Sequence, residues 1–184
     1  MKFEQLIYDW KNRELPFKKQ AILEAGFTIW EDFRFSKDPN NLGNLIQNQI
    51  CSLINFDRDF DFVEFDLNLL KKSVFAPFSE WNLGSLNANF QSTFITTAYM
   101  NVYKYNLWSN SYQNAINRML YNQNMTLIGV YSSSLDTVLI IDGCETIIAY
   151  LRMIANGYTP QTCNIFLQTI NFELEDLFLE IYSR

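Results

Sequence analysis

The segment from Met125 to Gly157 restricts the folds open to this chain more than any other stretch. It begins with two short runs of strand-forming residues, MTLIGVY and TVLIID, separated only by SSSLD. Two such runs joined by a short polar connection predict a β-hairpin. The second run ends at Asp142-Gly143, and an amphipathic helix is expected from Glu145 to Asn156, with Gly157 as its stop. The apolar face of this helix is Ile147, Ile148, Leu151 and Ile154.

Further elements are predicted on both sides of this segment. Ser109 or Ser111 is positioned to cap a helix that ends at Asn122-Gln123-Asn124. A short strand, TCNIFLQ, is expected after Pro160, and a last amphipathic helix has the sequence FELEDLFLEIY. We expect an α+β fold, with these strands and helices in its core.

The N-terminal third predicts helices rather than strands. An amphipathic helix is expected at residues 2–14, and Pro16 suits the first turn of a second helix that ends at Gly26. The clearest helical stripe in the chain lies between Leu42 and Ile54. We therefore expect residues 1–56 to form a helical layer that packs on an α+β core, residues 57–184, as one compact unit.

The chain of 184 residues contains no histidine and has a formal net charge of −6. The lack of histidine excludes Ser-His and Cys-His nucleophile pairs, histidine general bases and His-rich zinc sites. The negative charge disfavours sequence-independent DNA binding and suits a protein that binds a basic partner. No apolar run approaches a membrane span, and three cysteines without a secretory signal indicate the cytoplasm.

The densest acidic cluster is FDRDFDFVEFD, residues 56–66. Phe60 and Phe62 alternate with acids, which predicts a strand with one wet face. Such a strand would point Asp57, Asp59 and Asp61 the same way and offer a patch to a basic partner. A solvated sheet edge, a metal site and a mimic of phosphates are the alternatives. The spacing is not that of a calcium loop, because no glycine follows.

Between Glu80 and Asp136 the chain has no acidic residue, and only Lys104 and Arg118 carry charge. Amide and hydroxyl side chains fill this stretch, together with aromatic ones. Such groups can bind bases or the nucleic-acid backbone without electrostatic repulsion, and aromatic rings can stack on bases. The alternative is a set of ordinary strands whose aromatic residues face the core.

The Asp142-Gly143-Cys144-Glu145-Thr146 turn holds the candidate catalytic residues. Asp142 and Glu145 can hold Mg²⁺ or Mn²⁺ for attack of water on a phosphodiester, or one of them can act as a general base. Cys144 is a candidate nucleophile, because a helix N-terminus activates a thiol. In the alternative, Asp142 caps the helix and Glu145 complements its dipole. Cys51 and Cys163 are expected in the core.

The order of elements from Asn114 onward and the Asp-Gly turn resemble the ParB/sulfiredoxin superfamily. The resemblance covers residues 112–168. In that family an arginine ends the turn and holds a phosphate, whereas this chain has Thr146 in that place. Sulfiredoxins read Gly-Cys-His-Arg, of which Cys144 remains. The resemblance implies that Gly143 and Thr146 belong to a turn that faces a phosphate. Arg118 or Arg152 could fold back to this turn and replace the missing arginine. ParB-like proteins with this motif include nucleases.

Two functions of different classes are therefore expected. One is a nucleic-acid-acting protein, in its sharpest form a metal-dependent RNase. The other is an inhibitor or immunity protein that binds a basic protein without catalysis. The size, acidity and lack of histidine are similar to those of type II anti-CRISPR proteins, which implies RNA or the Cas9–guide RNA complex as a partner.

Overall fold

The computed structural model describes residues 3–24, 26–34, 50–55, 57–76, 93–106, 108–121, 125–158 and 162–170. Within them the chain is a mixed α+β protein built on one six-stranded sheet, in the order β1-β6-β4-β5-β2-β3. The strands are β1 (Asp61–Glu64), β2 (Ser73–Phe75), β3 (Thr93–Phe94), β4 (Met125–Ser132), β5 (Thr137–Asp142) and β6 (Cys163–Thr169). The α+β fold class predicted from the sequence is confirmed.

The hairpin β4–β5 forms the middle of the sheet, as its sequence predicts. The two strands are antiparallel, with Val130 opposite Leu139, and Asp136 adopts a positive φ of 49° in the connection. β4 runs parallel to β6, and β5 runs parallel to β2. Both central strands are almost continuously buried because helices cover both faces of the sheet, which explains their unbroken apolar runs.

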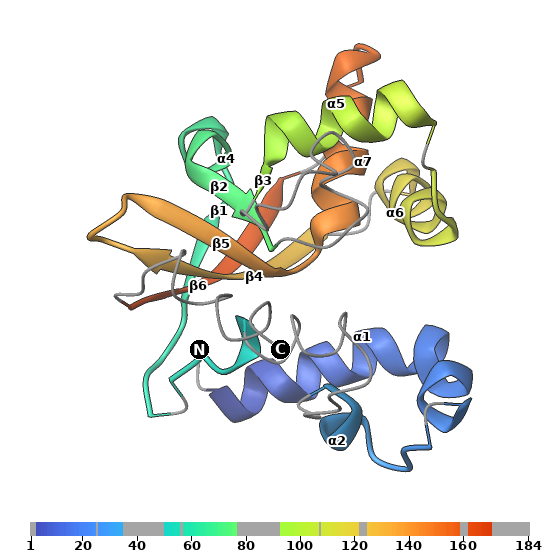
Figure 1. Ribbon diagram of the computed structural model, residues 1–184, viewed down its shortest axis with the longest axis vertical. Helices are drawn as coiled ribbons and strands as arrows, with labels where there is room; N and C mark the ends of the chain where they lie inside the picture. Colours follow the sequence, from blue (N-terminus) through green and yellow to red (C-terminus); the bar gives the residue numbers. More distant parts are fainter. Residues whose placement is uncertain are drawn as a thin grey trace, which may run out of the picture.

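Helices lie in two layers, one on each face of the sheet (Figure 1). One layer holds α1 (Phe3–Glu24) and α2 (Trp30–Arg34). The other holds α4 (Leu67–Lys72), α5 (Ile95–Tyr105), α6 (Asn110–Leu120) and α7 (Cys144–Ala155). Each face has its own core: Leu6, Trp10 and Ile22 of α1 pack with Val130 and Leu139, whereas α7 packs on the opposite face. The predicted N-terminal helical layer is present in this form.

α1 is one continuous helix, so the predicted division into two helices at Pro16 is wrong. A proline inside a helix removes one backbone hydrogen bond. Here Leu6 and Trp10 before Pro16 and Ile22 after it are all buried in the same core. Packing of both halves on the sheet therefore outweighs the local preference for a break.

Two other local predictions are confirmed. Ser109 is the N-cap of α6, and its hydroxyl accepts the backbone N–H of Tyr112 at 3.0 Å. α7 begins one residue before the predicted start, and its end has Gly157 at a φ of 79° with the Tyr158 N–H bonded to the Met153 carbonyl at 3.0 Å. This pair is a Schellman stop, in which glycine is favoured by the left-handed backbone.

Two stretches differ from the prediction. Ile95–Tyr105 forms helix α5, not a strand with an aromatic core face. β1 begins only at Asp61, and residues 57–58 form a turn and bend before it. Most of the helical stripe between Leu42 and Ile54, and the last predicted helix, lie outside the described residues. Among the helices that are described, none combines the length and hydropathy needed to cross a membrane.

Candidate functional site at the end of strand β5

Gly143 fixes the turn between the central strand β5 and helix α7. Its φ is 98° and its ψ is 19°, which is the left-handed region. A Cβ atom at this position would lie 2.5 Å from Cδ2 of Leu127 on the neighbouring strand β4. Both the dihedral angle and the close approach require glycine. The turn is therefore held tightly against the sheet, with Asp142 on one side of it and the first turn of α7 on the other.

Asp142 does not cap α7. The N-cap residue is Gly143, which has no side chain, and no side-chain hydrogen bond caps the helix. The predicted alternative in which Asp142 accepts the N–H groups of Glu145 or Thr146 is therefore wrong, because Asp142 lies one residue too early. The Asp142 carboxylate instead lies 3.8 Å from Nη2 of Arg34, on the α1 side of the sheet.

Arg34 belongs to a buried group of charges beneath the end of β5. Its side chain is 8% exposed, and Nε donates to Oε2 of Glu14 at 2.8 Å, while Nη2 pairs with Oε1 of the same carboxylate. Trp30 donates its indole N–H to Glu14 at 2.8 Å. The guanidinium of Arg34 also lies 5.1 Å from the ring centroid of Trp10. Glu14 is therefore the main counter-ion of Arg34, and Asp142 is a more distant one.

Two further arginines approach the same end of the sheet. Nη1 of Arg13 donates to the carbonyl of Thr126 on β4 at 2.9 Å. Burial and the charge of Arg13 lower the pKa of Arg118, and the charge of Asp142 opposes this. Arg118 of α6 is therefore close enough to feel both groups. We call Arg13 of α1, Arg34 of α2 and Arg118 of α6 the arginine cluster; Arg34 lies 3.8 Å from Asp142, and Arg118 interacts with the Asp142 charge at longer range.

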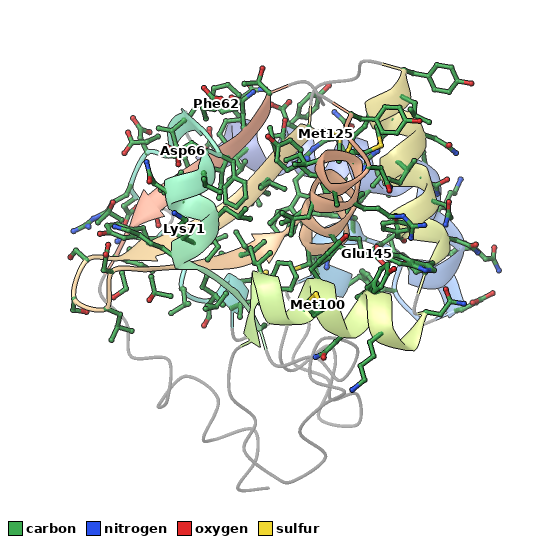
Figure 2. The ribbon with its side chains drawn as sticks, turned by 90° about the horizontal axis from the view of Figure 1, so that it is seen from above. Phe62, Asp66, Lys71, Met100, Met125 and Glu145 are labelled. Carbon is green, nitrogen blue, oxygen red and sulfur yellow. The ribbon has the colours of Figure 1, made fainter. Side chains whose placement is uncertain are left out.

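Glu145 has a different set of partners. Its Oε1 accepts a hydrogen bond from the hydroxyl of Ser109, which is also the N-cap of α6, so the starts of α6 and α7 are joined. Glu145 is labelled in Figure 2. Asp142 therefore lies near Arg34 of the α1 layer and interacts with Arg118 of α6 at longer range, whereas Glu145 is bound to Ser109 at the start of α6. The two carboxylates were predicted to share a metal ion or a proton. In the structure each of them interacts with a different residue.

Arg152 lies away from the turn. It is eight residues beyond Cys144 in α7, which corresponds to about 12 Å along a helix axis. Its guanidinium stacks 4.0 Å from the ring centroid of Trp108 and 5.7 Å from that of Tyr112. The two rings are 4.5 Å apart. Arg152 thus serves the contact between α6 and α7, and of the two arginines predicted to reach the turn only Arg118 approaches Asp142.

The remaining residues of the turn are less accessible than the sequence indicates. Thr146 is 7% exposed, and Cys144 is half-buried against the core of the α7 face. None of the three cysteines forms a disulfide in the described structure. Cys51 and Cys163 are buried as predicted, and burial raises the pKa of Cys163 to about 12.

The predicted partner-binding acids lie at the edge of the sheet, on and before β1, which is three strand positions from β5. Asp57 and Asp59 precede β1, Asp61 begins it, and all three are exposed. β1 is the outermost strand on this side within the described sheet, paired only with β6. Phe62 on β1 is 56% exposed although its ring lies 4.7 Å from that of Phe166. Asp66 is the N-cap of α4, and the backbone N–H of Leu69 lowers its pKa.

Arg13, Glu14 and Arg34 were not among the residues predicted from the sequence. A signal was present in α1: Arg13 and Glu14 follow the buried Trp10 at spacings of three and four residues. Such spacings place side chains on one helix face, so the pattern predicts two charged side chains on the apolar face of α1. Charges on an apolar face indicate a buried polar contact. The pattern does not predict that Arg34 of α2 is the partner in this contact.

In the described part of the chain, no group of three or more cysteine, aspartate or glutamate side chains is arranged to hold a metal ion. Comparison with protein-family models, with curated proteins and with solved structures finds no match to this chain. The resemblance to the ParB/sulfiredoxin superfamily therefore stays a prediction made from the turn and the order of elements.

Proposed function

We propose that this chain is a non-enzymatic binding protein that contacts a basic partner protein through the edge of its sheet at β1. The observation that carries this proposal is the exposure of all four residues of β1 at the outer edge of the sheet. We name this surface, residues 57–66, the acidic edge. This proposal takes up the inhibitor or immunity protein that the sequence analysis gave as an alternative, and it assigns the contact to residues 57–66.

Charge defines the chemistry of the acidic edge. Its ten residues hold five carboxylates and a single arginine, Arg58. Asp57, Asp59, Asp61 and Glu64 are exposed, so their charges face solvent. Charges of one sign gathered on a surface steer an oppositely charged partner and speed its association. A nucleic acid would be repelled here, whereas a lysine- or arginine-rich protein surface would be attracted.

Apolar contacts are available at the centre of the same edge. Phe62 and Val63 are exposed between Asp61 and Glu64. An outer strand also presents backbone N–H and C=O groups to which an extended partner segment can pair. Acidic flanks with an apolar centre match the usual pattern of a binding surface, in which buried apolar contacts supply affinity and rim charges supply specificity.

The test is a binding assay with Cas9, alone and with guide RNA, because Cas9 is the basic partner that the resemblance to anti-CRISPR proteins implies. The variant Asp57→Lys, Asp59→Lys, Asp61→Lys reverses the acidic edge. The control Glu4→Lys, Glu24→Lys, Asp32→Lys changes the net charge equally at exposed positions of α1 and α2. We expect wild type and control to bind, binding to weaken with salt, and the acidic-edge variant to bind at least about tenfold more weakly.

Equal binding by the two triple variants would refute the acidic edge as the contact surface. Absence of binding by the wild-type protein to either form of Cas9 would remove Cas9 as the partner. A metal-dependent nuclease at Asp142 and Glu145 stays the competing prediction, and its own assay is described below.

A further inference from the structure

We propose that β1 binds an extended segment of its basic partner as a further strand of the sheet. This inference rests on the proposed function and specifies the partner. The segment has two neighbouring apolar residues with one basic residue on each side of them. The outward backbone groups of β1, its exposed apolar side chains and its charges together define this pattern.

The backbone of β1 faces β6 only at every second residue. In an antiparallel pair, residues that exchange hydrogen bonds alternate with residues whose N–H and C=O groups point away from the partner strand. The Phe65 N–H donates to the Cys163 carbonyl at 2.8 Å, just beyond the end of β1. Counting back by two residues along the register, Val63 also faces β6. The backbone groups of Phe62 and Glu64 therefore point outward.

Three of these four outward backbone groups are open to a new partner. The Glu64 carbonyl accepts the Asp66 N–H at 3.0 Å. The Phe62 N–H, the Phe62 carbonyl and the Glu64 N–H have no backbone partner within the described residues, where no strand lies outside β1. Both residues are exposed. Groups of this kind at a sheet edge pair with the backbone of an incoming strand.

Exposed apolar side chains are present on both faces of this edge. Successive residues of a strand point to opposite faces of the sheet. Phe62 is paired with Phe166, which belongs to the core on the α1 side, and Val63 is paired with Ile165, which belongs to the core on the α7 side. Both side chains stay exposed, and Phe62 is labelled in Figure 2. Apolar residues directly opposite them on an added strand would cover both.

The charges determine the residues on each side of this apolar pair. Asp61 and Glu64 flank Phe62 and Val63 and are exposed. Opposite charges directly across two strands stabilise their pairing, and like charges destabilise it. A basic residue therefore fits opposite each acid, whereas a second copy of this chain would bring further acids to the edge. The resulting pattern, basic-apolar-apolar-basic, reads the same in both directions and fits a parallel or an antiparallel strand.

The edge is fixed to β6 before a partner binds. The side chain of Gln168 on β6 is buried, and its Nε2 donates to the carbonyls of Asn55 at 2.9 Å and Arg58 at 3.0 Å. Its Oε1 accepts the Asn55 N–H at 2.7 Å. These bonds hold the segment before β1, and the Phe65 N–H holds the segment after it. A surface that is already ordered loses little conformational entropy on binding.

The experiment is an NMR titration of the full chain with the peptide Ser-Gly-Lys-Val-Val-Lys-Gly-Ser, blocked at both ends. We expect hydrogen exchange of the Phe62 and Glu64 amides to slow at least about tenfold when the peptide is bound, because both become hydrogen-bonded. The Val63 amide faces β6 and is the internal control, so its protection should be the same with and without peptide.

Two N-methylated peptides separate strand pairing from attraction between charges. A methyl group on the nitrogen of the second valine removes the N–H that would donate to the Phe62 carbonyl in either strand direction. The same group on the first valine points away from β1, so this peptide is the matched control with equal charge. We expect binding to weaken at least about tenfold for the first peptide and little for the control.

The protein offers the complementary pair of variants. Phe62→Pro removes the outward N–H and the ring, whereas Phe62→Ala removes the ring alone. Proline is tolerated on an edge strand where its nitrogen faces solvent. We expect Phe62→Pro to bind the unmodified peptide more weakly than Phe62→Ala does. If Phe62→Pro fails to fold, as judged by circular dichroism, the two N-methylated peptides decide.

Equal binding of the two N-methylated peptides, or rapid exchange of the Phe62 and Glu64 amides at saturation, would overturn strand addition. Neither result would affect the acidic edge, whose failure is seen separately as equal binding of Cas9 by the two triple variants. No binding of the unmodified peptide up to about 10 mM would also overturn the inference. A dimer of the free protein with a protected Phe62 amide would assign the edge to a second copy and overturn it as well.

Discussion

At the scale of single residues, a side chain at Gly143 would meet both an unfavourable backbone conformation and a close neighbour. Gly143→Ala would add a Cβ atom 2.5 Å from Leu127 in a left-handed backbone. We expect it to lower the free energy of unfolding by about 2–4 kcal/mol. Gly157→Ala is the matched control, since its φ is also positive but nothing lies within 4 Å. It should cost only about 1 kcal/mol. Urea unfolding measures both, and equal losses would contradict the packing explanation.

The three thiols should differ in reactivity. Cys51 and Cys163 are buried, and the pKa of Cys163 is raised to about 12, so its thiol stays protonated at pH 8. Because the folded-state pKa is raised, this protonated thiol favours folding below the unfolded pKa, and that contribution is lost as the pH rises toward 12. We expect a disulfide reagent at pH 8 to modify Cys144 first and the other two only in denaturant. Prompt modification of Cys163 in the folded protein would contradict its burial.

The roles of single residues were only partly predictable. The sequence identified the Asp142-Gly143 turn and the buried Cys163, because both follow from local pattern. It named Arg118 as an arginine that could reach the turn, but it did not identify Arg34 as a partner of Asp142, since Arg34 lies far away in sequence. It also missed that Glu145 accepts a hydrogen bond from Ser109, 36 residues earlier. Side-chain pairing between elements depends on tertiary packing, and the hydrophobic periodicity of the sequence does not predict it.

At the scale of elements, α1 shows packing prevailing over local preference. Pro16 is exposed inside α1 and removes one helical hydrogen bond. We expect Pro16→Ala to raise the free energy of unfolding by about 1–2 kcal/mol, because the bond is restored and only part of the gain is offset by the more flexible unfolded chain. Lys19→Ala, also exposed on α1, is the control and should change little. A lower stability of Pro16→Ala in urea unfolding would show that the proline shapes the helix.

The elements themselves were predicted best where period and boundary signals agree. The hairpin β4–β5, helix α6 with its Ser109 cap and helix α7 with its Gly157 stop all have both. The prediction was wrong at Pro16, where packing on the sheet outweighs the tendency of proline to break a helix. It was also wrong at Ile95–Tyr105, where aromatic and β-branched residues lie in a helix. Such residues favour strands only weakly, so their packing on α7 and the sheet decides the outcome.

At the scale of the whole molecule, the two carboxylates of the predicted nuclease have different partners: Arg34 of α2 lies near Asp142, and Ser109 at the start of α6 is bound to Glu145. We expect end-labelled guide RNA to remain intact when it is incubated with the protein and Mg²⁺ or Mn²⁺, with or without Cas9. This follows because Asp142 interacts with Arg34 and Glu145 with Ser109. Discrete products that disappear with EDTA and in Asp142→Ala or Glu145→Ala would contradict this expectation and establish the RNase.

The position of β6 has a consequence for how the molecule is made. β6, near residue 165, lies between β1 and β4, so β1 has no neighbour in the described sheet until the chain has been synthesised almost to residue 170. The contact between Arg13 and Thr126 likewise joins residues 113 apart. Contacts of such long range form slowly, because a large loop must close before they stabilise the chain. On the ribosome, β1 and the apolar face of α1 would therefore remain uncovered while the later strands emerge, and the sheet would close only after synthesis is nearly complete.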